Sequence, residues 1–115
     1  MILGNLKEIE MAAQVTIRCA RSGYKFIVIE NEKKEIIIFA DDDPCYRYHR
    51  DLLAQYRQES GLRAQCLGGG RIAFDEKMKT IRIWDSSGDF GYEPSREDTV
   101  NMIRAAYPDF QVAAG

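Results

Sequence analysis

The hydrophobic positions of this chain fall into short runs that are typical of strands. Residues 24–30 are β-branched and aromatic, and residues 35–40 contain an unbroken apolar run that follows a polar turn. An unbroken run is typical of a strand that is buried on both faces, and the turn between the two segments predicts a hairpin. Residues 64–74 and 79–84 predict two more strands, the second with alternating apolar and polar positions.

A helix is predicted between these two pairs of strands, ending at about residue 59. His49 and Tyr56 lie on one stripe at helical spacing, and Gly61 is a suitable C-terminal stop. Three consecutive aspartates and Pro44 precede this segment. Because proline is tolerated in the first turn of a helix and an aspartate before it can act as a cap, we expect Pro44 in the first helical turn.

A second helix is predicted near the C-terminus. Residues 95–98 (Ser-Arg-Glu-Asp) resemble a capping box in which aspartate replaces the usual glutamate. Val100, Ile103 and Tyr107 follow at helical spacing, and Pro108 ends the helix.

The order of these elements predicts the fold class. Residues 110–112 predict a short final strand, and residues 14–19 are a candidate for an additional N-terminal strand. The order β-β-α-β-β-α-β predicts an α+β fold, with one mixed sheet and two main helices packed against it. A chain of 115 residues is of a suitable size for a single domain of this kind.

The composition excludes several classes of protein. A net charge of −2 gives no basic face for nonspecific nucleic-acid binding, and no apolar run approaches the length of a membrane span. Residues 1–10 lack a basic segment followed by an apolar core, so no secretory signal is expected.

Three widely spaced cysteines (Cys19, Cys45 and Cys66) are typical of reduced thiols, and we expect a cytoplasmic protein. One histidine and scattered cysteines give no metal-ligand spacing, so we expect neither a metal nor a cofactor.

The candidate chemistry lies in residues 66–72 (Cys-Leu-Gly-Gly-Gly-Arg-Ile) and in His49, the single histidine. Three consecutive glycines bury no side chain and cost backbone entropy, so they indicate a sharp turn or a close approach of the backbone to another group. Cys66 and Arg71 resemble the ends of the phosphate-binding loop of tyrosine phosphatases. That loop is one residue longer and leads into a helix, whereas a predicted strand follows Arg71, so we do not expect Cys66 to be a nucleophile.

The acidic turn before the first helix has a second possible interpretation, as the aspartate motif of haloacid dehalogenases. Residues 36–43, an apolar strand followed by Asp-x-Asp, are similar to the start of haloacid dehalogenases. A chain of this length is too short for that doubly wound domain and its later motifs, and Pro44 interrupts the usual continuation. The triple aspartate is therefore interpreted as a solvated turn and a helix cap.

Five segments, taken in order, resemble a known family: residues 24–29, 48–51 (Tyr-His-Arg-Asp), 66–72, 81–84 and 106–110 (Ala-Tyr-Pro-Asp-Phe). Together they resemble the 14-kDa phosphohistidine phosphatase family, which includes the Janus and Ocnus proteins. The resemblance extends over most of the chain from the first of these segments onward, and the Cys-Leu-Gly-Gly-Gly-Arg-Ile segment is its most specific part. The residues before the first segment are left unassigned.

This resemblance implies metal-free hydrolysis of phosphoramidate bonds, chiefly those of protein phosphohistidine. The catalytic histidine of the family matches His49 as the general base for the attacking water, and the family's strand lysine matches Lys25 as a partner of the phosphate charge. The amides that cradle the phosphate, together with the arginine of the glycine run, match Arg50, Ser87, Gly88, Asp89 and Arg71. For the amide of His49 to take part as well, the regular helix must begin near Tyr48, with Pro44 in an extended lead-in.

Three positions depart from the family pattern. Arg50 follows the histidine directly where a small residue is usual, Asp41 stands where an arginine is common, and Asp89 replaces a small neutral residue. A carboxylate at Asp89 would repel phosphate unless it points outward. These positions favour an alternative function, a non-catalytic phosphate- or protein-binding module of the same fold.

Simpler interpretations of the same residues stay open when the residues are taken alone. A lone histidine in a helix is often structural, a strand lysine such as Lys25 often faces solvent, and Arg71 can hold the glycine run instead of touching a substrate. The expected substrate is a phosphohistidine-containing protein or a small phosphoramidate, with no nucleic-acid or membrane partner. The sequence does not determine the oligomeric state, and a monomer is expected.

Overall fold

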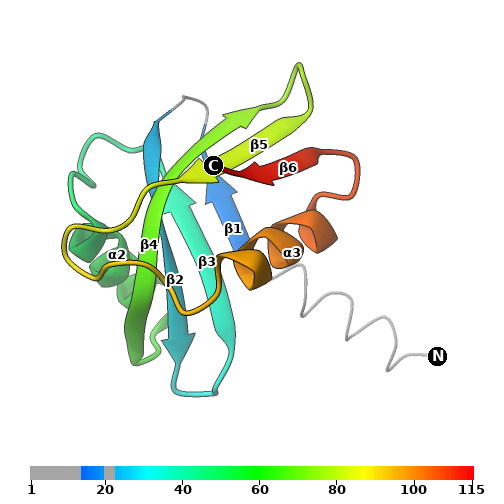
Figure 1. The fold of residues 1–115 in the computed structure, drawn as a ribbon. Helices are drawn as coiled ribbons and strands as arrows, with labels where there is room; N and C mark the ends of the chain where they lie inside the picture. The colour runs from blue at the N-terminus through cyan, green and yellow to red at the C-terminus, as the bar shows by residue number, and fades with distance from the viewer. Residues whose placement is uncertain (1–13, 20–22) are drawn as a thin grey trace.

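A six-stranded mixed sheet forms the centre of the structure, a computed structural model that describes residues 14–19 and 23–115 (Figure 1). Its strands are β1 (Val15–Arg18), β2 (Tyr24–Asn31), β3 (Ile36–Asp41), β4 (Ala64–Asp75), β5 (Thr80–Trp84) and β6 (Gln111–Ala114). In space they follow the order β1-β3-β2-β4-β5-β6. The outer strands β1 and β6 run parallel to their neighbours, and the four central strands are antiparallel. The predicted α+β fold is therefore confirmed, and the candidate N-terminal strand is present as β1.

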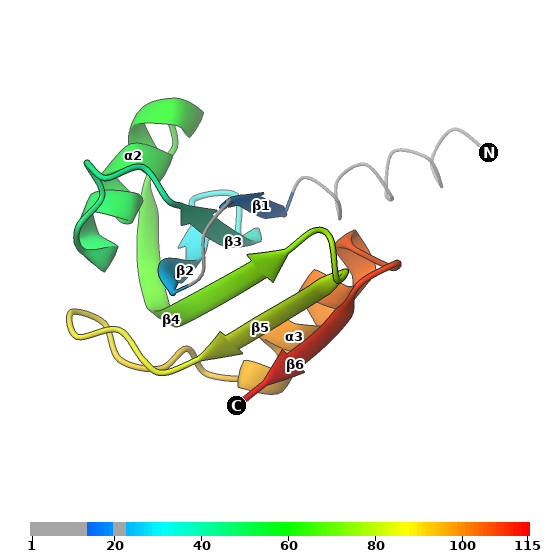
Figure 2. The same ribbon diagram turned by 90° about the horizontal axis from the view of Figure 1, so that it is seen from above.

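Two helices cover opposite faces of this sheet (Figure 2). Helix α2 (His49–Ser60) packs on β2, β3 and β4, and α3 (Arg96–Ala106) contacts β1 and β6. Strands β2 and β3 consequently contribute to both cores, with Ile27 and Phe39 in the core under α2 and Val28 and Ile38 in the core under α3. Burial on both faces explains the unbroken apolar runs, since each fully buried side chain of this size contributes about 1.5–3 kcal/mol.

The expectation that Pro44 occupies the first turn of the helix is wrong, because α2 begins at His49. The aspartates before it form local turns: a carboxylate oxygen of Asp43 accepts a hydrogen bond from the amide of Cys45 at 2.9 Å. Such side-chain bonds compete with helix formation. Tyr48 is the N-cap residue, and its amide donates to the Asp51 carboxylate at 2.9 Å. The later start leaves Pro44 in a turn before the helix, and among the residues that lead directly into α2 the N-cap Tyr48 is extended.

The glycine run does not form a turn but continues as part of β4. The close backbone approach that it also predicted is confirmed. A Cβ on Gly69 would lie 3.2 Å from the His49 ring, and one on Gly70 would lie 2.6 Å from the carbonyl oxygen of Asp85. Glycine is required at Gly69 because a Cβ would also clash with the backbone carbonyl of Phe26 in β2, and at Gly70 because it would clash with the end of β5 and the chain that leaves it.

The C-terminal end of α2 and the N-terminal end of α3 are capped by the residues that the sequence predicts. Gly61 adopts a left-handed conformation, with a φ of 70°, and ends α2. The hydroxyl of Ser95 accepts a hydrogen bond from the amide of Asp98 at 3.1 Å at the start of α3. Neither helix in the described part of the chain is long and apolar enough to cross a membrane.

Candidate functional site

A pocket of about 170 Å³ forms where the first residues of α2 meet β2, β4 and the loop after β5. The loop that follows β5, drawn in yellow in Figure 1, extends toward α2 and closes one side of this site. We call this the histidine pocket. It is lined by Lys25, Tyr48, His49, Arg71, Asp85, Ser86, Gly88 and Asp89.

His49 is the buried member of the pocket, with only 5% of its surface exposed. Its Nε2–H donates to the carbonyl oxygen of Gly70 at 3.0 Å. Because a carbonyl only accepts, this bond places the ring proton on Nε2 and leaves Nδ1 as the basic nitrogen. Burial lowers the pKa of His49, and the positive charges of Lys25 and Arg71 lower it further, against the raising effects of the Gly70 bond and Asp89. The imidazole is therefore neutral at pH 7 and suited to accept a proton.

Lys25 lies near the beginning of β2, directly opposite Arg71 in the β2–β4 ladder. Its side chain is half-buried and lines the pocket together with His49. Its ammonium makes no hydrogen bond or ion pair with any residue that the structure describes. The structure thus brings an available positive charge and a neutral imidazole into one pocket.

Arg71 also lines the pocket, but its guanidinium is partly engaged. Its Nη1 donates to the carbonyl oxygen of Gly23 at 3.2 Å, and its Nε lies 3.6 Å from a carboxylate oxygen of Asp85. Both side chains are about half exposed, so this ion pair is weak. Arg71 therefore combines the two roles that its position allowed: it holds neighbouring backbone and it adds positive charge to the pocket.

The loop after β5 is held together by Ser87. Its hydroxyl accepts hydrogen bonds from the amides of Asp89 at 3.2 Å and Phe90 at 3.0 Å, and the side chain is buried. Ser87 itself is not among the residues that line the pocket, whereas Gly88 and Asp89 are. The Asp89 amide is thus occupied within the loop, and the amides of His49 and Gly88 make no hydrogen bond to the rest of the described chain.

Asp89 and Arg50 meet at the mouth of the pocket. A carboxylate oxygen of Asp89 lies 3.4 Å from the amide nitrogen of Arg50, and the other lies 3.5 Å from the Arg50 guanidinium. The guanidinium also stacks on the Tyr48 ring at 4.3 Å. The carboxylate does not point outward, because it contacts an N-terminal amide of α2, a type of donor that commonly binds anions.

Asp41 and Cys66 lie outside this chemistry. Asp41 forms an ion pair with Arg18 at 2.7 Å, and Arg18 also binds Glu59 of α2. The pKa of the Cys66 thiol is raised to about 11, chiefly by burial, so the thiolate that a nucleophile requires is not formed at neutral pH. Cys66 therefore belongs to the packing of β4.

Sequence reasoning missed Tyr48, Asp85 and Ser86 as lining residues. The strand register explains the place of Asp85, because Trp84 lies opposite Arg71 and the next residue lies beside the end of the glycine run; the sequence carries no signal for this register. Among residues 14–19 and 23–115, no three His, Cys, Asp or Glu side chains lie close enough together to hold a metal ion.

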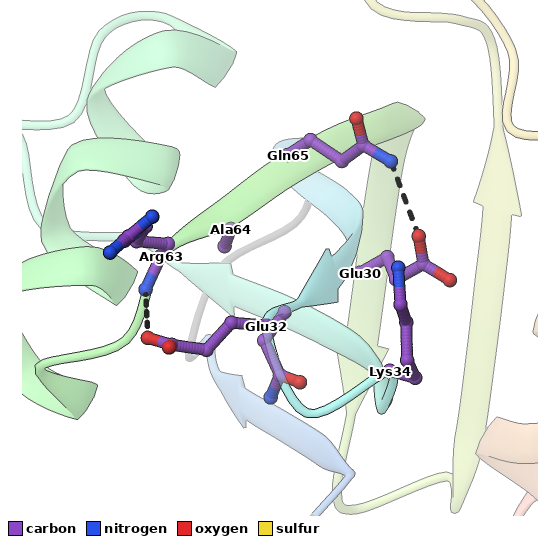
Figure 3. Close-up of a pocket in the computed structure, with 7 residues that line it drawn as sticks. Glu30, Glu32, Lys34, Arg63, Ala64 and Gln65 are labelled. Atoms are coloured by element: carbon purple, nitrogen blue, oxygen red, sulfur yellow. Dashed lines mark hydrogen bonds between the residues drawn. The ribbon is translucent and has the colours of Figure 1, made fainter.

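A second polar pocket, of about 280 Å³, lies at the opposite end of β2 and β4 (Figure 3). Two of its hydrogen bonds join side chains to their neighbours across the strands, from the Gln65 amide to Glu30 at 3.2 Å and from the Arg63 backbone amide to Glu32 at 2.8 Å. We call this the hairpin pocket. It is lined by Glu30, Asn31, Glu32, Lys34, Arg63, Ala64 and Gln65, and contains no histidine.

Comparison with known proteins agrees with the motif resemblance. The chain is 32% identical over 68 residues to the 14 kDa phosphohistidine phosphatase of Sus scrofa, covering 56% of this chain and 53% of that protein. The protein of the same name from Homo sapiens is 33% identical over 69 residues, with coverages of 56% and 54%. The sex-regulated protein janus-A of Drosophila yakuba is 26% identical over 96 residues, with coverages of 77% and 69%.

The alignments with the two phosphatases span only about half the length of each relative. The model of the Janus/Ocnus family, however, matches residues 9–111 and so begins well before the first motif at residue 24. Since this match covers nearly the whole sequence, including the histidine, the glycine run and the loop after β5, the chain belongs to the Janus/Ocnus family.

Proposed function

We propose that this protein is a phosphohistidine phosphatase that hydrolyses phosphoramidate bonds without a metal ion. In this proposal His49 is the general base, and Lys25 balances the charge of the phosphoryl group. The substrate is a phosphohistidine on a protein or a small phosphoramidate, and the chain acts as a monomer in the cytosol. The observation that carries the proposal is the presence of a buried neutral imidazole and an available ammonium in one pocket.

The proposed reaction is a direct displacement at phosphorus. Nδ1 of His49 accepts a proton from a water molecule while the water oxygen attacks phosphorus. The P–N bond breaks, and the leaving nitrogen keeps the bonding electron pair and takes a proton from solvent. The His49 imidazolium then returns its proton to solvent. The Gly70 carbonyl binds Nε2–H throughout, which keeps the ring oriented and favours the imidazolium as it forms.

The rest of the pocket supplies charge and hydrogen-bond donors for the phosphoryl oxygens. Lys25 and Arg71 bring positive charge, and the amides of His49 and Gly88 are donors without another partner in the described chain. Donors that are fixed before the substrate arrives are the main source of transition-state stabilisation in such sites. The relatives named 14 kDa phosphohistidine phosphatase support this class of reaction.

The test is phosphate release from phosphoramidate and from a phosphohistidine peptide, measured with EDTA present. We expect wild-type protein to release phosphate and His49→Ala to lose this activity by about 10²- to 10⁴-fold, the usual contribution of a general base. Tyr56→Phe is a matched control, because Tyr56 is another buried ring of α2 that lies outside the pocket. Equal activity in wild type and His49→Ala would refute the role of His49.

A second candidate function is a phosphate- or protein-binding module without catalysis. The contact between the Asp89 carboxylate and the Arg50 amide favours it, because it fills a position that an anionic substrate needs. The same assay separates the two functions. A folded wild-type protein that binds inorganic phosphate at the histidine pocket but releases none from either substrate would establish the binding module.

A further inference from the structure

An ion pair between the buried carboxylate of Glu93 and the partly exposed guanidinium of Arg96 lies on the other side of the sheet from His49, with the Arg96 side chain 20% exposed. Glu93 is 5% exposed, and its two carboxylate oxygens accept hydrogen bonds from Arg96, from Nε at 2.9 Å and from Nη2 at 2.8 Å. The Thr99 hydroxyl donates to the same carboxylate at 2.6 Å. Burying the charge of Glu93 costs several kcal/mol, and apolar residues often replace pairs of this kind without loss of stability. Stability alone therefore does not explain this pair.

The Arg96 guanidinium also binds two backbone carbonyls that the sheet leaves without a partner. Its Nη2 donates to the carbonyl oxygen of Gly69 at 3.2 Å and to that of Asp85 at 2.8 Å. The β4–β5 ladder ends at the pair Arg71 and Trp84, so these two carbonyls lie just beyond its last rung. Arg96 thus joins the glycine run of β4 to the chain that leaves β5.

The glycine run is paired with β2 on one side, but it lies beyond the last β4–β5 pair on the other, where the amide of Gly69 donates to the carbonyl oxygen of Gly91 at 3.0 Å. Glycines have no side chains to pack, and their backbone is the most easily deformed. Arg96 approaches the run from the α3 side, where its guanidinium lies 5.2 Å from the Phe26 ring, while His49 contacts the run from α2. The carbonyl of Gly69 binds Arg96, and the carbonyl of the next residue, Gly70, binds Nε2–H of His49.

We propose that Arg96, held by Glu93, is a positioning residue that fixes the Gly70 carbonyl and thereby the tautomer and orientation of His49. Through Asp85, which lines the histidine pocket, Arg96 also fixes the pocket wall opposite α2. Arg96 itself does not line the pocket, so it acts through these neighbours and not on the substrate. The effect on catalysis rests on the proposed function, whereas the effect on the His49 ring does not.

Arg96→Lys is the informative substitution. Lysine keeps the charge opposite Glu93, but its ammonium cannot reproduce the planar fork that reaches the carboxylate and both carbonyls. Since His49 is the only histidine in the chain, its ring nitrogens give a single pair of ¹⁵N signals. In wild type these signals report protonated Nε2 and unprotonated Nδ1 above the pKa. In Arg96→Lys we expect the two ¹⁵N signals of the His49 ring to move toward the values of a mixture of exchanging tautomers. We also expect kcat to fall about tenfold, with a smaller change in KM.

Two further variants keep the test decisive. Thr99→Val removes a hydrogen bond from the same buried carboxylate without touching either carbonyl, so we expect wild-type ring signals and kcat. If Arg96→Lys does not fold, the double variant Arg96→Met/Glu93→Gln removes both charges and tests the same anchor. Unchanged His49 signals in a folded Arg96 variant, or the same change in Thr99→Val, would overturn the positioning role. A wild type that hydrolyses neither substrate would refute the proposed function alone, because the ring signals still decide the inference.

Discussion

Strands β2 and β4 carry a polar pocket at each end, and the two pockets differ in how their charges are used. The histidine pocket holds a half-buried lysine that makes no hydrogen bond or ion pair within the described chain, next to a histidine that is 5% exposed. In the hairpin pocket, Glu32, Lys34 and Arg63 are exposed (Figure 3). The buried polar group there, Asn31, has partners for both ends of its amide.

If the histidine pocket is the active site, as we propose, the density of polar residues alone does not identify it. The hairpin pocket is the larger of the two and carries charges of both signs. Its groups are solvated or bonded to each other, so binding an anion there would first require their separation. In the histidine pocket a charge and a proton acceptor are already placed without competing partners, which is the condition for catalysis by fixed groups.

Replacing one lysine in each pocket should give the largest difference in kcat/KM between the two pockets. Lys25→Gln should lower kcat/KM for phosphoramidate by about 10²-fold, because it removes the available charge that faces the phosphoryl group. Lys34→Gln removes an equally charged residue from the hairpin pocket and should change kcat/KM by less than about twofold. Steady-state kinetics of the two variants tests this contrast. Similar losses in both would show that the whole strand pair, and not one pocket, provides the charge.

The elements of this fold could be predicted from the sequence because their signals are local. The apolar run from Ile36 and the Ser95 cap both correspond to observed structure. The sequence places the start of α2 at Pro44, which is wrong. Turns formed by the neighbouring aspartates override the preference of proline for the first helical turn. Local sequence signals therefore predict which helices and strands form, whereas competition between such signals determines the residue at which an element begins.

The lining of the histidine pocket could be predicted only in part, because Arg50 and Ser87 were expected there and do not line it. His49, Lys25 and Arg71 line one pocket, as the family resemblance implied, yet no local pattern shows that Lys25 lies opposite Arg71. That pairing depends on the register of β2 and β4, which includes an irregularity between Val28 and Ile29. The proposed role of Arg96 could not be predicted because it depends on the backbone carbonyls of Gly69 and Asp85, which carry no sequence signal.

A substitution in the hairpin pocket should show that its buried amide serves stability. Asn31→Ala removes hydrogen bonds to the Tyr56 hydroxyl and to the Glu35 carboxylate and amide, and leaves buried polar groups without partners. We expect the free energy of unfolding to fall by about 2 kcal/mol while kcat stays at the wild-type value. Urea denaturation and the phosphate-release assay measure the two quantities. A folded Asn31→Ala protein with lost activity would break the distinction between the pockets.

Neutralising one carboxylate at each end should give a smaller, opposite effect. Asp89→Asn keeps an acceptor for the Arg50 amide but removes the charge that opposes a phosphate, so we expect inorganic phosphate to bind about fivefold more tightly. The gain should shrink at high salt. Glu30→Gln removes a carboxylate from the hairpin pocket and should leave phosphate affinity unchanged. Weaker binding in Asp89→Asn, measured by titration, would mean that Asp89 serves to order Arg50 and not to compete with the anion.

The pH dependence gives the finest separation of the two pockets, because only the histidine pocket contains an imidazole. Burial holds the pKa of His49 below its ordinary value of 6.5, so activity should persist as the pH falls through 6.5 and decline only near the lower, folded-state pKa. Between these two pKa values the unfolded chain binds more protons, so His49 should make the protein less stable as the pH falls across this window. His49→Gln should lack this slope.

The same lysines provide the control for this titration. The charge of Lys25 lowers the pKa of His49, so Lys25→Gln should raise that pKa toward 6.5, whereas Lys34→Gln should leave it unchanged. The ring protons of the single histidine report both shifts by NMR. A His49 pKa above 6.5 in wild type would contradict the effect of burial, since it would mean that the folded chain favours the imidazolium.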